Sequence, residues 1–142
     1  MMEPVLLVQA GRFRVALRMV DVLEVTERSL IHLVPNSGPA LRGVTDARGR
    51  LVPVVHLGAL LSDGEAPATE GDTLVIASIG SGTVALEVEA ADAISHGELL
   101  PVPPENNLPW ADGALRLADG WVPVLKFEAL GERLRAMETW VE

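Results

Sequence analysis

The residues able to do chemistry in this chain are few, and they are not arranged as a catalytic site. His32, His56 and His96 show no metal-ligand spacing, and no cysteine supplies a thiolate ligand or nucleophile. An aspartic protease with duplicated halves needs Asp-Thr/Ser-Gly in each half, which residues 72–74 (Asp-Thr-Leu) do not supply. A Gly-x-Ser-x-Gly elbow, a phosphate-binding loop and a dinucleotide fingerprint are also missing. These absences predict a protein that is not an enzyme and uses neither metal nor cofactor, with His56 at the rim or surface of a strand.

The charge balance limits the kinds of partner that the chain can have. Asp and Glu number 20 against 11 Lys and Arg, so the net charge of -9 repels nucleic-acid phosphate and anionic lipid. Aromatic residues make up 4% of the chain, which is too few for stacking on bases. The start, Met1–Pro4, does not resemble a signal peptide, and no apolar run approaches the roughly 20 residues that span a bilayer. We therefore expect a cytoplasmic protein with no nucleic-acid partner and no membrane insertion.

A repeat links the two halves of the chain. Residues 50–60 (RLVPVVHLGAL) align with residues 120–130 (GWVPVLKFEAL), with Val-Pro-Val in register. Gly43 and Gly113 keep the same separation. The chain is therefore predicted to fold as two copies of one strand plan.

Short apolar runs separated by Gly, Pro and other turn residues predict β-strands. Pro53 cannot donate a hydrogen bond to a neighbouring strand, so its strand is expected at a sheet edge or at a bulge. The tail has apolar residues at helical spacing, which predicts a C-terminal helix. The predicted strands are 5–10 with 13–19, a helical turn leading into a strand at 21–26, 41–46 with 51–57, 73–79 with 83–88, and 113–117 with 121–127, and a single helical turn is expected at 58–61.

This plan predicts an all-β fold of two similar five-stranded SH3-like β-barrel subdomains in a pseudo-two-fold arrangement, plus a C-terminal helix. Small sheets of this kind remove their edges by closing into barrels. Residues 1–142 are expected to form a single domain. Its expected parts are subdomain 1 at about 5–62, a linker at 63–71, subdomain 2 at about 72–130 and the helix at about 128–141. Trp110, Trp121 and Trp140 are expected to anchor packing between the subdomains.

Four motifs of the first half match a known family pattern. They are VLEV at 22–25, a Pro-punctuated loop at 35–39, GVTDARG at 43–49 and PVVHL at 53–57. In this order and spacing they resemble the CheW-type coupling proteins of bacterial chemotaxis, and the resemblance extends from Val5 to about Leu130. The chain departs from the family pattern where Asp46 replaces the usual Asn, where His56 replaces the usual Asp, and at Lys126.

The resemblance implies a non-catalytic adaptor that couples chemoreceptors to a CheA-type histidine kinase in bacterial chemotaxis or a related chemosensory pathway. The implied partners are the cytoplasmic tip of a methyl-accepting chemoreceptor and the regulatory domain of the kinase, which is itself a CheW-like double barrel. Two alternatives stay open. One is a small duplicated β-barrel binding module of another class, and the other is an enzyme with an unrecognised carboxylate site.

Glu24 and Arg48 occupy positions of opposite charge in the family pattern. We predict a salt bridge between them that holds the receptor-facing surface in shape, the alternative being two unrelated surface charges. Gly43 is predicted either to allow a backbone conformation that a bending strand requires or to let a receptor helix pack closely.

Three valines complete the candidate site. Val22, Val25 and Val34 either line an apolar docking strip for the receptor or belong to the barrel core. No residue is assigned to kinase binding. The candidate receptor-binding residues implied by the resemblance are therefore Val22, Glu24, Val25, Val34, Gly43 and Arg48.

Overall fold

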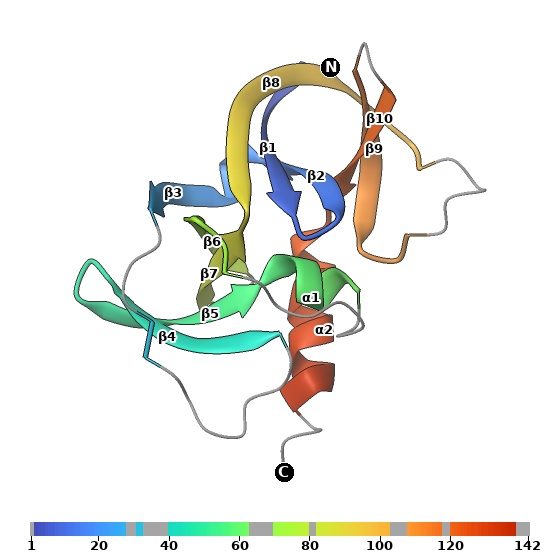
Figure 1. The fold of residues 1–142 in the computed structure, drawn as a ribbon. Helices are drawn as coiled ribbons and strands as arrows, with labels where there is room; N and C mark the ends of the chain where they lie inside the picture. The colour runs from blue at the N-terminus through green and yellow to red at the C-terminus, as the bar shows by residue number, and fades with distance from the viewer. Residues whose placement is uncertain are drawn as a thin grey trace.

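The structure is a computed structural model that describes residues 2–27, 31–32, 40–62, 70–79, 82–102, 108–117 and 120–138. Within these ranges the chain is mostly β-strand, with a short helix in the middle and a longer one at the C-terminal end (Figure 1). The elements are β1 (Met2–Ala10), β2 (Phe13–Arg18), the 3-10 turn η1 (Met19–Asp21), β3 (Val22–Glu27), β4 (Leu41–Ala47), β5 (Arg50–His56), α1 (Leu57–Leu61), β6 (Thr73–Ile79), β7 (Gly82–Val88), β8 (Ala90–Leu100), β9 (Ala111–Leu117), β10 (Gly120–Leu125) and α2 (Phe127–Glu138).

The described strands form two sheets of five. One is a closed barrel in the order β1-β2-β10-β9-β8, and the other has the order β3-β6-β7-β5-β4. Strands five places apart in the chain occupy equivalent positions, so β1–β5 and β6–β10 are two copies of one plan. The predicted fold class, two similar five-stranded units with a C-terminal helix, is confirmed.

The sheets do not follow the two halves of the sequence. The β1–β2 hairpin joins β8 to β10 of the second copy, and the β6–β7 hairpin joins β3 to β4 and β5 of the first. The parallel pairs β2–β10 and β5–β7 each join a strand of one copy to a strand of the other. The predicted subdomains at 5–62 and 72–130 therefore do not coincide with the sheets, because each hairpin pairs with strands of the other copy. Most of the predicted linker, at 63–69, lies outside the described residues.

The repeat spacing of the sequence is kept in the backbone. A β-bulge interrupts the register between Leu41 and Gly43 in β4, and its counterpart falls where Gly113 of β9 meets Val124. Gly43 has a φ of 146° and Gly113 a φ of 154°, values that favour glycine. A Cβ on Gly113 would also lie 2.9 Å from the carbonyl oxygen of Leu100. The backbone need predicted for Gly43 is thus present at both bulges.

Alternate residues of the central strands face different cores. In β1, for example, Val5 and Leu7 fill the closed barrel, whereas Leu6 and Val8 join a larger cluster shared by both sheets, α1 and α2. A third cluster fills the second sheet. The alternation explains why such short strands are almost continuously apolar, since both of their faces are buried.

The three tryptophans differ in their packing. Trp110 is 3% exposed and packs edge-on against Phe13, with ring centroids 5.9 Å apart. Trp110 therefore anchors the shared core as predicted. Trp121 is 49% exposed, so the same prediction is wrong for it, and Trp140 lies outside the described residues.

The strand that contains Pro53 is not at an edge, which corrects the prediction. β5 lies between β7 and β4, and the nearest bulge belongs to β4. Pro53 is tolerated because the ladder from β5 to β7 begins only at Val54, so the missing N–H has no partner to lose on that side. Among the described residues, no helix has both the length and the apolar character needed to cross a membrane.

Candidate functional site

The candidate site lies at the seam between β3 and β4, where the second sheet is left open. The equivalent strands of the closed barrel pair directly, Leu99 with Leu115 and Leu100 with Ala114. Across the seam, backbone pairing among the described residues is reduced to an isolated bridge in which His32 and Val44 exchange hydrogen bonds of 2.8 and 2.9 Å. Side chains at this seam are therefore free to form a surface that the closed barrel lacks.

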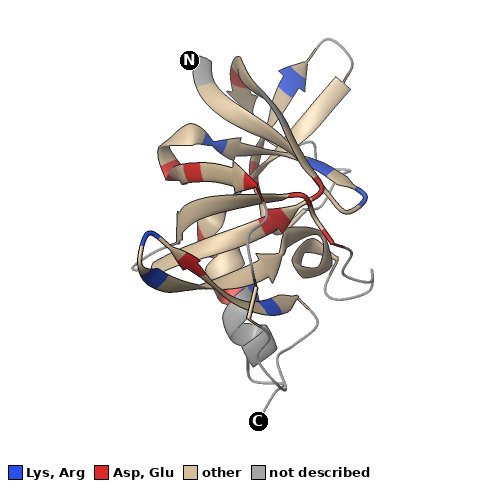
Figure 2. Ribbon diagram, turned by 60° about the vertical axis from the view of Figure 1, so that its left-hand side comes forward, with Lys and Arg blue, Asp and Glu red and all other residues tan. Residues whose placement is uncertain are grey.

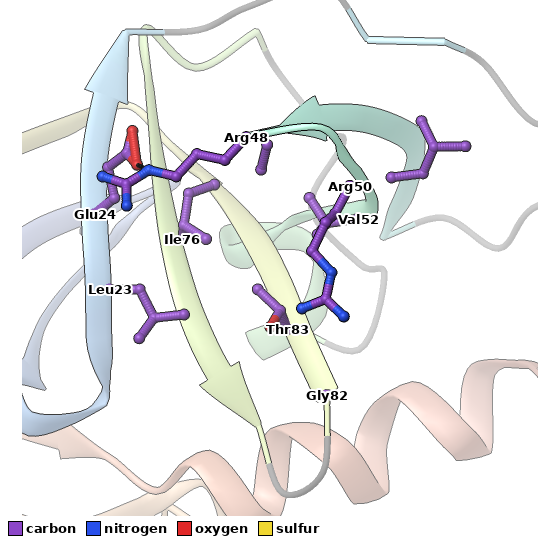
Figure 3. Close-up of a pocket in the computed structure, with 10 residues that line it drawn as sticks. Leu23, Glu24, Arg48, Arg50, Val52, Ile76, Gly82 and Thr83 are labelled. Carbon is purple, nitrogen blue, oxygen red and sulfur yellow. Dashed lines mark ion pairs between the residues drawn. The ribbon is translucent and has the colours of Figure 1, made fainter.

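An ion pair crosses the seam. Nε of Arg48 lies 2.9 Å from Oε1 of Glu24, and Figure 3 shows the arginine reaching from its turn to β3. The predicted salt bridge is thus confirmed. The Arg48 side chain is 81% exposed and that of Glu24 35%, so solvent screening limits the contribution to stability to about 0–1 kcal/mol. Its main consequence is geometric, because it holds the β4–β5 turn against β3.

The β4–β5 turn is built to present Arg48. Arg48 has a φ of 55° and Gly49 a φ of 83°, and positive φ at both central residues is the mark of a type I′ hairpin. The Asp46 carboxylate accepts a hydrogen bond of 2.7 Å from the Gly49 N–H. Asp46 therefore serves as the turn acceptor where the family pattern has Asn, and this departure leaves the turn intact.

A pocket of about 510 Å³ opens beside the ion pair, and we call it the seam pocket (Figure 3). Its lining comes from β3, the β4–β5 hairpin, β6 and β7. Val52 and Ile76 line it at 5% and 6% exposure and belong to the core of the second sheet. Leu23 and Leu51 line it at 59% and 71% exposure. The pocket thus combines an apolar floor with an apolar rim that faces solvent.

A bulge explains why neighbouring residues of β3 both line the pocket. The register of β3 against β6 shifts between Val22 and Glu24, which removes Leu23 from the ladder. Leu23 and Glu24 then both contribute to the pocket instead of pointing to opposite faces.

Two arginines join the exposed leucines at the rim of the pocket. Arg48 and Arg50 both line it, and Figure 3 shows Arg50 extending toward Thr83. Figure 2 shows basic residues at this hairpin in a chain of net charge -9. Arg50 is exposed, and in the part of the chain that the structure describes no carboxylate lies within ion-pairing distance of it.

The structure brings only part of the predicted receptor-binding set together. Glu24 and Arg48 meet, and Val25 is 44% exposed on the same strand. Val22 is half-buried against the shared core, and Gly43 is buried at its bulge. Val34 lies outside the described residues. Sequence reasoning missed Leu23, Arg50 and Leu51, although three apolar residues among four in VLEV could have indicated a strand with apolar side chains left in solvent.

His56 is not part of the site. It is 1% exposed, so the prediction of a rim or surface position is wrong. Its Nδ1 accepts the Ala59 N–H at 3.0 Å, which caps α1, and its Nε2 lies 3.0 Å from Oε2 of Glu89. Because Nδ1 is an acceptor, the ring proton is on Nε2 and is donated to Glu89. A histidine nitrogen therefore caps α1 at the position where the family pattern has Asp.

A second ion pair, away from the seam, holds a buried carboxylate. Glu87 is completely buried, and its Oε1 lies 2.9 Å from Nε of Arg42 at the β4 bulge, while its Oε2 accepts the Gly71 N–H at 2.8 Å. The equivalent place in the closed barrel has the charges reversed, with Arg18 of β2 lying 4.0 Å from Asp112 of β9. The two copies therefore conserve an ion pair while exchanging its polarity.

Comparison with known proteins places this geometry in context. Residues 4–135 match the family model described as the CheW-like domain. Among solved structures, the crystal structure of scaffolding protein TtCheW from Thermoanaerobacter tengcongensis superposes with a TM-score of 0.79 at 20% sequence identity. The match covers 92% of this chain and 88% of that one, and at this identity it is a likeness of fold. No curated protein matches the chain.

Proposed function

This chain belongs to the CheW-like domain family, and on that premise we propose that it is a non-catalytic adaptor coupling chemoreceptors to a CheA-type histidine kinase. The observation that carries the proposal is the exposed apolar seam held in shape by the Glu24–Arg48 ion pair. The structurally similar protein from Thermoanaerobacter tengcongensis is itself described as a scaffolding protein. A cytoplasmic location follows from this role.

The proposed receptor surface is centred on β3. Val20, Leu23 and Val25 are 76%, 59% and 44% exposed, and they follow one another along η1 and β3. Apolar side chains gathered on one exposed segment are typical of a protein interaction site. β3 also ends its sheet within the described residues, so its surface is not covered by a further strand.

Each predicted residue has a proposed part in this surface. Val25 contacts the receptor directly, and Val22 supports β3 from the core side. Gly43 allows the bulge that shapes β4, while Glu24 and Arg48 fix the turn. Val34 stays in the proposed set, although its surroundings are not described.

The kinase is proposed to bind elsewhere on the molecule. The family resemblance implies that the regulatory domain of the kinase is also a double barrel, so one barrel of this chain would meet a related barrel of the partner. Signalling contacts of this kind are often modest, on the order of 1,200 Å² or less. No residue is assigned to this contact.

A charge exchange tests the receptor surface. Arg48→Glu is expected to weaken binding of a purified chemoreceptor cytoplasmic fragment roughly tenfold, because two carboxylates then repel each other across the seam. The double variant Glu24→Arg with Arg48→Glu restores opposite charges and should recover part of the affinity. Isothermal titration calorimetry measures both, with thermal unfolding as the check on folding.

A matched control is available in the closed barrel. Arg116→Glu makes the same change of net charge at an exposed position on β9 and should leave receptor affinity within about twofold of wild type. Equal affinities for wild type and the Arg48 variant, or a double variant that recovers nothing while remaining folded, would count against the proposed pairing.

A further inference from the structure

The seam pocket has the features of a binding site for one apolar side chain. Its volume of about 510 Å³ lies within the roughly 300–1,000 Å³ typical of binding pockets. Val52 and Ile76 give it a floor that is already part of the core. Leu23 and Leu51 leave more than half of their accessible surface in water, so covering them removes apolar area from solvent.

The two arginines of the rim differ in whether the guanidinium is already in an ion pair among the described residues. Arg48 is occupied by Glu24 at 2.9 Å. Arg50 has no carboxylate within ion-pairing distance among the described residues, and its guanidinium is exposed beside the apolar rim. A guanidinium binds a carboxylate through two parallel hydrogen bonds, and closing an apolar surface around such a pair strengthens it.

We propose that the seam pocket takes an apolar side chain of a partner helix while Arg50 pairs with a carboxylate on the same face of that helix. Residues three or four apart share a face, so the recognised element is an acidic amphipathic helix with an apolar residue and an Asp or Glu at that spacing. This inference rests on the proposed function, because it assigns that helix to the chemoreceptor tip.

Charge favours this partner over other anions. A net charge of -9 opposes the approach of a polyphosphate, and the single guanidinium of Arg50 cannot offset it. A single carboxylate beside an apolar residue carries less charge, so the attraction of the Arg50 guanidinium is enough to hold it. A second copy of this acidic chain also carries exposed carboxylates, so self-association is the competing occupant that the experiment must separate.

The test uses the full chain and a purified receptor cytoplasmic fragment. Arg50→Glu is expected to weaken binding at least tenfold, whereas Arg116→Glu stays within about twofold, and both variants should melt like wild type. Wild-type affinity should also fall more steeply with added salt than the affinity of the Arg50 variant. Arg50→Lys keeps the charge without the paired hydrogen bonds, so it should fall between wild type and Arg50→Glu.

The outcomes separate this inference from the function on which it rests. If wild type binds the fragment and Arg48→Glu weakens it while Arg50→Glu does not, the receptor surface stands and the pocket assignment is overturned. If wild type does not bind the fragment, the proposed function fails first. If sedimentation shows a wild-type dimer that Arg50→Glu dissociates while receptor affinity is unchanged, the occupant is a second copy and the assignment is again overturned.

Discussion

Replacing Arg42 with Met is expected to destabilise the protein by roughly 3 kcal/mol, because it removes the cation that faces a buried carboxylate. Glu87 is completely buried and faces the Arg42 guanidinium at 2.9 Å. After the substitution the Gly71 N–H still donates its hydrogen bond of 2.8 Å to the carboxylate, but the guanidinium no longer balances the buried charge. Chemical denaturation followed by circular dichroism measures the loss.

The closed barrel supplies the control for this prediction. Asp112→Asn removes one charge from the equivalent pair, where the side chains of Arg18 and Asp112 are 35% and 52% exposed and 4.0 Å apart. The expected loss is below about 1 kcal/mol. Adding Glu87→Gln to Arg42→Met removes the buried charge, keeps an acceptor for the Gly71 N–H and should recover most of the stability. A cost of Arg42→Met no larger than that of Asp112→Asn would show that the buried charge is not the cause.

Adding one carbon at Gly58 is expected to cost about 2–3 kcal/mol, because α1 lies directly on the first hairpin turn. A Cβ on Gly58 would lie 2.8 Å from both Cα and N of Gly11 and 3.0 Å from the carbonyl carbon of Ala10. All three are backbone atoms, so no side chain can rotate away. Gly58→Ala should therefore destabilise the protein although alanine favours helices by about 1 kcal/mol. The midpoint of urea denaturation reports the change.

Gly82→Ala makes the same chemical change without the contact. The nearest atom to its new Cβ is the carbonyl oxygen of Ile79 at 3.9 Å, and the expected effect is within about 0.5 kcal/mol. If both alanine variants unfold at the same urea concentration, the close approach of α1 to the hairpin turn does not constrain the fold.

The repeat made much of the fold predictable from sequence. The Val-Pro-Val match and the shared spacing of Gly43 and Gly113 predicted two copies of one plan, and both glycines sit at bulges. The sequence did not predict which hairpin joins which sheet. The two hairpins have the same apolar pattern, so either could complete either sheet, and only the shared core decides between the arrangements.

β8 was missed because its local sequence does not resemble a strand. Residues 90–100 (AADAISHGELL) are mostly small or polar and show no regular alternation. A Cβ at position 97 would clash with the Leu115 side chain, which favours glycine there. This constraint comes from β9 and cannot be read from the local sequence. The position of β8 is therefore fixed by closure of the barrel and not by its own propensity.

The candidate site was predictable only where residues act in pairs. Glu24 and Arg48 match positions of opposite charge in the family pattern, and this resemblance pointed to a contact that the structure contains. The seam pocket depends instead on strands far apart in the chain, as Leu23, Leu51 and Ile76 illustrate. The order in which strands pair could not be read from the pattern, so the exposed rim and the place of Arg50 on it could not be predicted either.

The most direct test of the adaptor role is whether this chain holds both partners at once. Sedimentation velocity of the full chain with a receptor cytoplasmic fragment and the kinase regulatory domain measures this. We expect a single sedimenting species that contains all three proteins. Failure to bind either partner, or displacement of one partner by the other, would contradict the proposal that the chain couples them.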